Sequence, residues 1–205
     1  MACNGPRAAK PTGTVPNRRE PTAVSEVHIV PICLPSQPKL LDQVIAPIGR
    51  AFAATVSVLQ LRFDPELAFE SSRGQYNSTE LLAQLLAESE GSQARIIGIS
   101  GVDLFIPILT YVFGEAQLSG RAAVVSTYRL DNTRYGLPGN DRLLLDRLVK
   151  ESVHELGHTC GLVHCDHPTC VMRSSTYVED IDLKSAQFCS RCNSQVRSTQ
   201  SQRQR

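Results

Sequence analysis

One complete set of potential metal ligands and the first half of a second set lie within nineteen consecutive residues, HELGHTCGLVHCDHPTCVM, beginning at His154. His154 and His158 are four residues apart, so on an α-helix their imidazoles share one face and can bind one ion, with Glu155 at its edge. Gly161 can adopt a left-handed conformation that ends such a helix and lets His164 become a third ligand. Three neutral imidazoles leave the fourth tetrahedral position of Zn²⁺ open to water, which is typical of a catalytic zinc site.

Four cysteines form the second set. Cys165 and Cys170 make a C-x4-C pair, and Cys189 and Cys192 make a C-x2-C pair. Both spacings are typical of closed four-thiolate zinc sites, which leave no position for water. We therefore expect this ion to be structural and to hold the segment between the first and last cysteine against the rest of the chain. Because His164 precedes Cys165 directly, the cysteine site should also fix where the third histidine points.

With HExxHxxGxxH followed directly by a cysteine, C-x4-C, a nearby methionine and C-x2-C, the chain resembles an archaemetzincin, a branch of the metzincin clan of zinc peptidases. The resemblance implies two zinc ions per chain, Glu155 as general base and Met172 under the site in a Met-turn. Sixteen residues separate Met172 from Cys189, one fewer than in the family pattern, a difference that a loop can absorb. Some metzincins carry a tyrosine two residues after the methionine; that position is Ser174 here, and Tyr177 is a weak substitute. The implied zinc ligands are His154, His158 and His164 for the catalytic ion, and Cys165, Cys170, Cys189 and Cys192 for the structural ion.

Simpler interpretations apply to several other residues. An HExxH pentapeptide alone arises often by chance, and Met172 alone would be ordinary core filler. His167 lies inside the hairpin between the first two cysteines, which favours a solvent-facing loop residue. Cys160 points about 120° away from the first histidine around the helix, so we interpret it as a small buried hydrophobe. Cys3 and Cys33 are expected to be free thiols.

Length and composition agree with one compact enzyme domain. The chain has 205 residues, of which 41% are hydrophobic, and a formal net charge of +1. This balance indicates neither a nucleic-acid surface nor a membrane surface, and no apolar run is long enough to span a bilayer. Seven cysteines, an odd number, and an N-terminus without the apolar region of a secretory signal favour a reducing compartment. We expect a cytoplasmic protein that is a monomer.

The sequence divides into four parts. Residues 1–24, which include Pro6, Pro11, Pro16 and Pro21, are expected to be a disordered arm, because they lack core-forming side chains. Residues 25–164 should form an α/β subdomain with the active-site helix. Residues 165–192 should form a C-terminal subdomain with the structural zinc and the Met-turn, and the polar residues 193–205 a disordered tail.

Hydrophobic periodicity predicts alternating strands and helices, which favours an α/β fold with a mixed, mainly parallel sheet. The resemblance implies the same fold, with a metzincin-like mixed sheet, a long active-site helix and a small zinc-stapled C-terminal subdomain. Pro31 suggests that the first strand is an edge strand or carries a bulge, and Pro47 should bend or interrupt the first helix. The expected strands are 25–33, 55–63, 94–100 and 122–128, and the expected helices are 39–52, 77–90, 141–160 and 182–188.

The resulting functional prediction is zinc-assisted hydrolysis of peptide bonds, with Glu155 as general base and aminopeptidase action as one possible form. The partner would be a peptide or protein that adds a strand to a sheet edge, for which residues 113–119 are the candidate; Glu115 in that segment could equally be a solvated loop acid. The alternative is a zinc-stabilised binding protein with little or no peptidase activity. A nucleic-acid-binding zinc module fits worse, because Arg197, Arg203 and Arg205 follow the last cysteine without interleaved aromatic residues.

Overall fold

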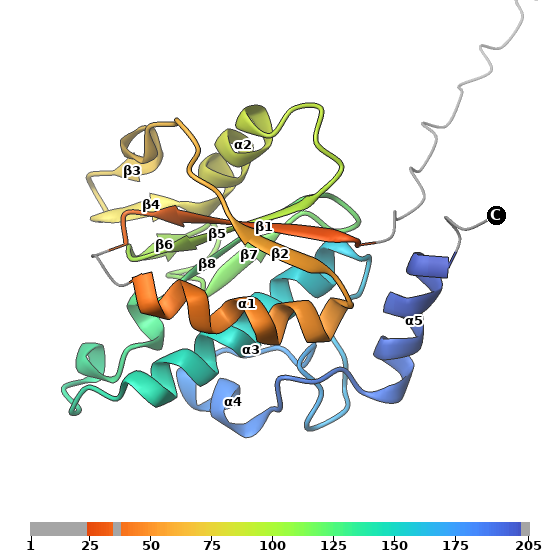
Figure 1. The fold of residues 1–205 in the computed structure, drawn as a ribbon. Coiled ribbons are helices and arrows are strands. Elements are labelled where there is room, and N and C mark those ends of the chain that lie inside the picture. Colours follow the sequence, from red (N-terminus) through yellow and green to blue (C-terminus); the bar gives the residue numbers. More distant parts are fainter. Residues whose placement is uncertain (1–23, 35–37, 202–205) are drawn as a thin grey trace, which may run out of the picture.

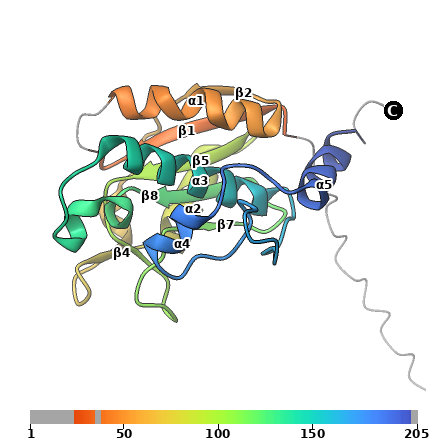
Figure 2. The same ribbon diagram turned by 90° about the horizontal axis from the view of Figure 1, so that it is seen from below.

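The computed structural model describes residues 24–34 and 38–201, in which helices cover both faces of a five-stranded sheet (Figures 1 and 2). Helix α2 lies on one face, and α1 and α3 lie on the other, with α4 and α5 beyond α3. The helices are α1 (Pro38–Phe52), α2 (Ser78–Glu88), α3 (Asp141–Thr159), α4 (Val178–Leu183) and α5 (Ser190–Ser201). The strands are β1 (Glu26–Ile32), β2 (Thr55–Val58), β3 (Phe69–Glu70), β4 (Gln75–Asn77), β5 (Arg95–Ser100), β6 (Leu104–Phe105), β7 (Gly114–Ala116) and β8 (Ala122–Ser126).

The main sheet has the strand order β2-β1-β5-β8-β7. Its first four strands are parallel, and β7 pairs antiparallel to β8 at the edge. A second, three-stranded sheet has the order β3-β4-β6. The α/β class and the mixed, mainly parallel sheet expected from the sequence are therefore confirmed.

Alternating side chains along the central strands build one hydrophobic core on each face of the sheet. On β1, Val27 and Ile29 belong to the core under α1 and α3, whereas Val30 and Ile32 belong to the core under α2. Both cores are fully enclosed at these positions, because the four side chains are at most 1% exposed. Burial on both faces explains why the central strands read as nearly continuous apolar runs.

Two alternatives based on proline were wrong: that the first strand is an edge strand, and that Pro47 interrupts the first helix. Strand β1 is an inner strand, not an edge strand; Pro31 is tolerated because β2 pairs with β1 only as far as Ile29. Helix α1 continues through Pro47 without interruption. Its buried residues, Val44, Ile48 and Phe52, lie on both sides of the proline, so packing of this face against the sheet outweighs the one hydrogen bond that proline removes.

Helix α3 is the longest helix of the described residues, and its second half is almost entirely enclosed. Asn140 caps it by accepting a hydrogen bond from the backbone N–H of Leu143 at 3.1 Å, as the sequence predicted. The buried Arg147 binds both carboxylate oxygens of Asp182 at 2.7 Å and donates to the carbonyl of Leu130. The helix that carries the histidines is thus fixed at its start and along its length.

The C-terminal part differs from the expectation in two places. The position predicted for a short helix, 182–188, is wrong. Helix α4 lies earlier, at Val178–Leu183, and an irregular segment leads from it to the last cysteine pair. The carboxylate of Asp180 accepts the backbone N–H groups of Thr176 and Tyr177, which caps α4 at an earlier position. The tail expected to be disordered from residue 193 onward is instead helical in its first part, since residues 193–201 belong to α5. Val196 of this helix is buried in the main core.

At the other end of the chain, Val24 is 5% exposed and belongs to the main core rather than to an arm. Residues 1–23 of the expected arm, with Cys3, lie outside the described residues, as do residues 202–205. Among the described helices, none combines the length and apolar character needed to cross a bilayer.

We expect Asn140→Ala to lower the free energy of unfolding by about 1 kcal/mol, because the N–H of Leu143 loses its acceptor at the start of α3. Chemical denaturation measures this difference. Asn140→Ser keeps an oxygen at the cap and should remain close to the parent; equal losses in both variants would contradict a capping role.

Candidate metal centres and the cleft between them

His154 and His158 lie one turn apart on α3, with their Nε2 atoms 3.1 Å apart. The Nδ1 atom of His154 lies 2.8 Å from the carbonyl oxygen of Val171, and that of His158 lies 2.8 Å from the carbonyl oxygen of Leu162. Because a carbonyl only accepts, each Nδ1 carries the proton, and each Nε2 of a neutral ring presents a lone pair. Two facing lone pairs cannot bond to each other, so a cation between them fits this arrangement.

His164 completes the group. Gly161 has a left-handed φ of 85° and donates its N–H to the carbonyl of His158 at 2.9 Å, which ends the helical path and reverses the chain. The ring of His164 thereby lies 5.3 Å from that of His154 and 5.1 Å from that of His158. One nitrogen from each of the three rings lies within 4.8 Å of the others, so the structure brings together all three histidines that the sequence singled out.

The spacing of the nitrogens fits zinc. Two ligands of a tetrahedral zinc with bonds of about 2.0 Å lie about 3.3 Å apart, close to the 3.1 Å between the Nε2 atoms. Burial lowers the pKa of His154 well below its usual value, with a smaller contribution from the nearby ammonium of Lys184. Burial likewise lowers the pKa of His158 and of His164. The rings therefore stay neutral near pH 7, which is the form that binds a metal ion.

Glu155 lies next to the histidines and against the edge of the sheet. Its burial raises the pKa of its carboxyl group well above the usual value, and the neighbouring carboxylate of Glu151 adds to this shift while Lys184 opposes it. A Cβ atom on Gly114 of β7 would lie 2.7 Å from Cγ of Glu155 and 2.7 Å from the carbonyl of Val124. Gly114 is therefore required for the close approach of β7 to Glu155, a role that sequence reasoning missed although it marked this segment.

Met172 lies under α3. It is fully buried, and a Cβ atom on Gly157 would lie 2.5 Å from its Sδ atom, so the absence of a side chain between the two histidines allows the methionine to pack there. The carbonyl of Met172 accepts the backbone N–H of Cys165 at 3.0 Å. Met172 therefore packs against the helical turn that carries both histidines, and its role in a Met-turn stays a prediction.

The four cysteines form a second compact group. Their Sγ atoms all lie within 4.8 Å of one another, and those of Cys165 and Cys189 are 3.8 Å apart. Sulfur ligands of a tetrahedral zinc with bonds of about 2.3 Å lie about 3.8 Å apart. Hydrogen bonding from the backbone N–H of Cys192 lowers the pKa of the Cys189 thiol to about 7, because this pair begins helix α5. The donor set and spacing fit a closed zinc site.

A short segment joins the two groups. Cys170 belongs to the thiol group, and the carbonyl of the next residue, Val171, accepts the proton of His154 Nδ1. His164 and Cys165 connect the groups at a second point. The position of the histidine rings therefore depends on the backbone that the cysteines hold.

His154 and His164 line a cleft of about 480 Å³. Residues 109–114 form one wall and residues 174–177 form the other, so Ser174 and Tyr177 both line it. Glu151, His154, Glu155 and His164 lie between the walls.

Glu151 and Lys184 form a buried ion pair that the sequence analysis missed. The Nζ atom of Lys184 lies 2.8 Å from the Oε1 atom of Glu151, and the two side chains are 0% and 4% exposed. Lys184 also donates to the carbonyl of Arg173 at 3.1 Å, next to Met172. The pair thus fastens the chain after Met172 to α3. One sequence feature could have indicated a role for Glu151: it precedes Glu155 by one helical turn and so lies on the same face of the helix.

The remaining candidates lie elsewhere. Cys160 is 1% exposed in the core, as expected, and His167 is exposed and outside both groups. Cys33 is an exposed free thiol. Glu115 accepts hydrogen bonds from the hydroxyls of Ser78 and Thr79 at the start of α2, so it is not a solvated loop acid.

Lys184→Met should lower the free energy of unfolding by about 3–5 kcal/mol, because it leaves the buried carboxylate of Glu151 without its cation. Denaturation midpoints measure the loss. Lys150→Met is the matched control: its partner Asp146 is 50% exposed, so water solvates the carboxylate and the loss should stay below about 1 kcal/mol. Similar losses in the two variants would argue against the buried pair as a brace.

Comparison with known proteins gives a consistent result. The model of peptidase family M54 matches residues 58–198. An archaemetzincin of Methanocaldococcus jannaschii is 36% identical over 169 residues, which cover 81% of this chain and 92% of the relative. The crystal structure of an archaemetzincin from Methanopyrus kandleri has a TM-score of 0.75 at 33% identity and covers 91% of this chain and 98% of that one. A zinc-dependent peptidase from Methanocorpusculum labreanum has a TM-score of 0.76 at 28% identity, covering 83% of this chain and 99% of that one.

Proposed function

We propose that this chain, which belongs to peptidase family M54, hydrolyses peptide bonds at the histidine cleft with Glu155 as general base. Family M54 is the family of the archaemetzincins, which are zinc metallopeptidases. The resemblance inferred from the sequence is thereby confirmed at the level of the family. The proposal for this chain's own residues depends on one observation: two histidine lone pairs face each other at 3.1 Å beside a buried carboxyl group.

The three histidines, His154, His158 and His164, would hold the catalytic zinc. Zinc in such a site supplies a Lewis acid that polarises the scissile carbonyl and lowers the pKa of water to about 7. The carbonyls of Val171 and Leu162 fix the tautomer of the first two rings and aim their Nε2 atoms at the ion.

Glu155 would move the proton. One of its carboxylate oxygens takes a proton from the attacking water, the water oxygen bonds to the carbonyl carbon, and the C–N bond then breaks as Glu155 returns the proton to the leaving nitrogen. Burial raises the pKa of Glu155, and a zinc ion at the neighbouring histidines would oppose that shift and favour the carboxylate that must first accept the proton. The same group can therefore hold the proton between the two transfers.

Strand β7 would orient the substrate. It is an edge strand, pairs only with β8 in the described sheet, and lies against Glu155 at Gly114. An extended peptide that adds to this edge would be aligned by main-chain hydrogen bonds. This assigns the substrate role to the edge segment that the sequence marked at 113–119.

Cys165, Cys170, Cys189 and Cys192 would hold the second, structural zinc, which gives two ions per chain. Four sulfur ligands leave no position for water, so this ion would stabilise the C-terminal segment rather than act on substrate. Aminopeptidase action is one form that the hydrolysis could take, and it would require a free substrate amino group; acetylating the peptide's N-terminus distinguishes it from endopeptidase action.

Glu155→Gln should leave both zinc ions bound and lower the rate of peptide hydrolysis by about 10²- to 10⁴-fold, because the amide cannot accept the water proton. A peptide library incubated with zinc-loaded protein, with metal content measured by mass spectrometry, provides both readouts. The exposed Glu80→Gln is the control. Parent-like turnover in Glu155→Gln would remove Glu155 from the mechanism, and absence of turnover in the parent would favour a zinc-stabilised binding protein.

Cys165→Ser should reduce bound zinc from two ions to one and weaken the remaining one, because the neighbouring His164 loses its anchor. Metal content and competition with a chelator measure the two effects. Cys33→Ser, which changes an exposed thiol outside both groups, should keep two ions. If the histidine site keeps its parent affinity in Cys165→Ser, the two sites are independent.

A further inference from the structure

The cleft has a direction along α3. Gly114 lies against Glu155, and further along the chain the N–H of Ser119 donates to the carbonyl of His158 at 3.0 Å. The β7 segment therefore runs from Glu155 toward the C-terminal end of α3. Tyr111 precedes β7 and lies toward the N-terminal half of α3, because Arg129 stacks on its ring and Arg147 of α3 donates to the carbonyl of the next residue, Leu130.

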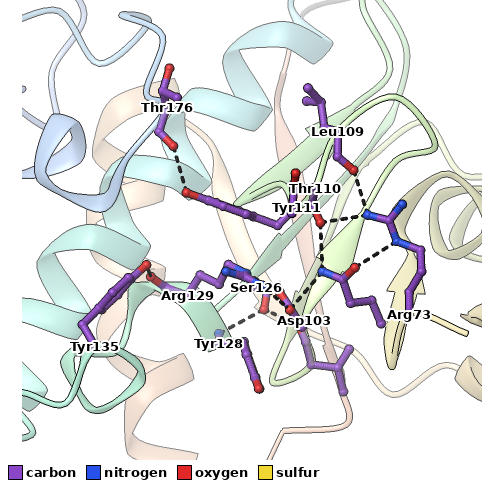
Figure 3. A network of polar contacts seen from close by, with 12 residues as sticks. Arg73, Asp103, Leu109, Thr110, Tyr111, Ser126, Tyr128, Arg129, Tyr135 and Thr176 are labelled. Atoms are coloured by element: carbon purple, nitrogen blue, oxygen red, sulfur yellow. Dashed lines mark hydrogen bonds and ion pairs between the residues drawn. The ribbon is translucent and has the colours of Figure 1, made fainter. Parts of the chain in front are cut away.

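At this end, Tyr111 joins the two walls of the cleft. Its hydroxyl donates a hydrogen bond to the carbonyl of Thr176, 3.0 Å away and 65 residues later in the chain. Figure 3 shows the ring reaching from the β7 side to the segment that carries Thr176. Both residues line the cleft, so the contact is a bridge across it.

The Tyr111 side of this bridge is held rigidly. The guanidinium of Arg129 stacks on the Tyr111 ring at 4.1 Å and binds both carboxylate oxygens of Asp103 at 2.6 Å (Figure 3). Arg73 donates to the carbonyls of Leu109 and Thr110, both at 2.9 Å. These contacts fix the position of the wall that carries Tyr111 without any contribution from a ligand.

The Thr176 side is also held, since Asp180 accepts the backbone N–H of Thr176 at 2.9 Å. Both ends of the bridge are therefore anchored in rigid structure. The hydroxyl of Tyr111 can reach its acceptor without ordering a flexible loop, so closing the bridge costs little conformational entropy.

We propose that the Tyr111–Thr176 bridge closes one end of the cleft and limits the substrate on that side of the cleaved bond to about three residues; the inference rests on the proposed peptidase function. The limit follows from length, because Gly114, which lies against Glu155, comes only three positions after Tyr111, and a chain advances at most about 3.3 Å per residue. The substrate class is accordingly short peptides, or chain ends with few residues beyond the cleaved bond.

The closed side is the C-terminal side of the cleaved bond. A peptide that adds to β7 pairs preferentially antiparallel, as β8 does on the other edge. Because β7 runs away from Tyr111, an antiparallel substrate runs toward it. The residues that follow the cleaved bond then point at the bridge, and the residues that precede it point at the open end near Ser119.

A binding experiment tests this without turnover. The zinc-loaded Glu155→Gln protein is titrated with fluorescent peptides that carry one to six residues beyond a fixed central bond, extended either at the C-terminal or at the N-terminal side. Affinity should rise up to about three C-terminal residues and fall beyond them, whereas N-terminal extension should cause no such loss.

The variant Glu155→Gln/Tyr111→Phe removes only the hydroxyl that makes the bridge, and should improve the affinity for six-residue C-terminal extensions by about fivefold, the size of one net hydrogen bond. Tyr111→Ala in the same background should improve it further. Tyr76→Phe is the control, because its hydroxyl also donates a hydrogen bond, to the carboxylate of Glu66 at 2.7 Å, but outside the cleft lining and outside the contacts that hold Tyr111. This control variant should leave the dependence of affinity on peptide length unchanged, for both C-terminal and N-terminal extensions.

Affinities that do not depend on C-terminal length, or a length limit that is identical in the Tyr111→Phe variant and its parent, would overturn the bridge as the limiting element. A limit on N-terminal extensions would overturn the assigned direction. Hydrolysis by the protein with Glu155 intact is measured on the same peptides: turnover without length dependence would reject only this inference, whereas length-dependent binding without turnover would reject only the proposed peptidase function.

Discussion

The structure depends on one electrostatic constraint, the two imidazole lone pairs of His154 and His158 that face each other at 3.1 Å. Each ring is fixed in one tautomer by a backbone carbonyl, that of Val171 or that of Leu162. Without a cation this arrangement is repulsive, so the surrounding fold must hold it in place. Both carbonyls belong to the segment that follows α3, which also carries Cys165 and Cys170 of the cysteine group. The geometry of the first site is consequently set by segments that belong to the second.

The helix that carries these rings is unusual in how much charge it buries. Arg147 and Glu151 are both less than 5% exposed, and each is neutralised by a residue from the segment after Met172, Asp182 and Lys184 respectively. Buried pairs of this kind add little net stability, but they penalise any packing in which the partners separate. They therefore fix the position of the C-terminal segment relative to α3. Within the part of the chain that the structure describes, Glu155 forms no ion pair, and its buried carboxyl group lines the cleft.

Small side chains decide how closely the elements approach this helix. Gly114 lets the sheet edge contact Glu155, and Gly157 lets Met172 pack against α3. At the sheet edge, Glu115 of β7 accepts hydrogen bonds from the start of α2, so this short strand connects α2, on one face of the sheet, to the cleft on the other. The same edge strand that would align an extended peptide leads back to Tyr111, which crosses to the opposite wall. Substrate alignment and substrate length would thus be set by neighbouring parts of one segment.

Much of this protein could be predicted from the sequence, because local spacing governs it. Ligand spacing on a helix, the left-handed glycine, the cap at Asn140 and the alternating apolar runs all act over a few residues, and they predicted α3, the parallel sheet and both ligand groups. The sequence did not predict the continuation of α1 through Pro47, the positions of α4 and α5, or the pairing of Glu151 with Lys184, since burial and charge neutralisation between distant segments decide these. The approach of Gly114 to Glu155 and the bridge from Tyr111 to Thr176 depend on how two walls face each other across a cleft. That is a property of the tertiary structure alone, because no spacing along the chain encodes the distance between residues 65 positions apart.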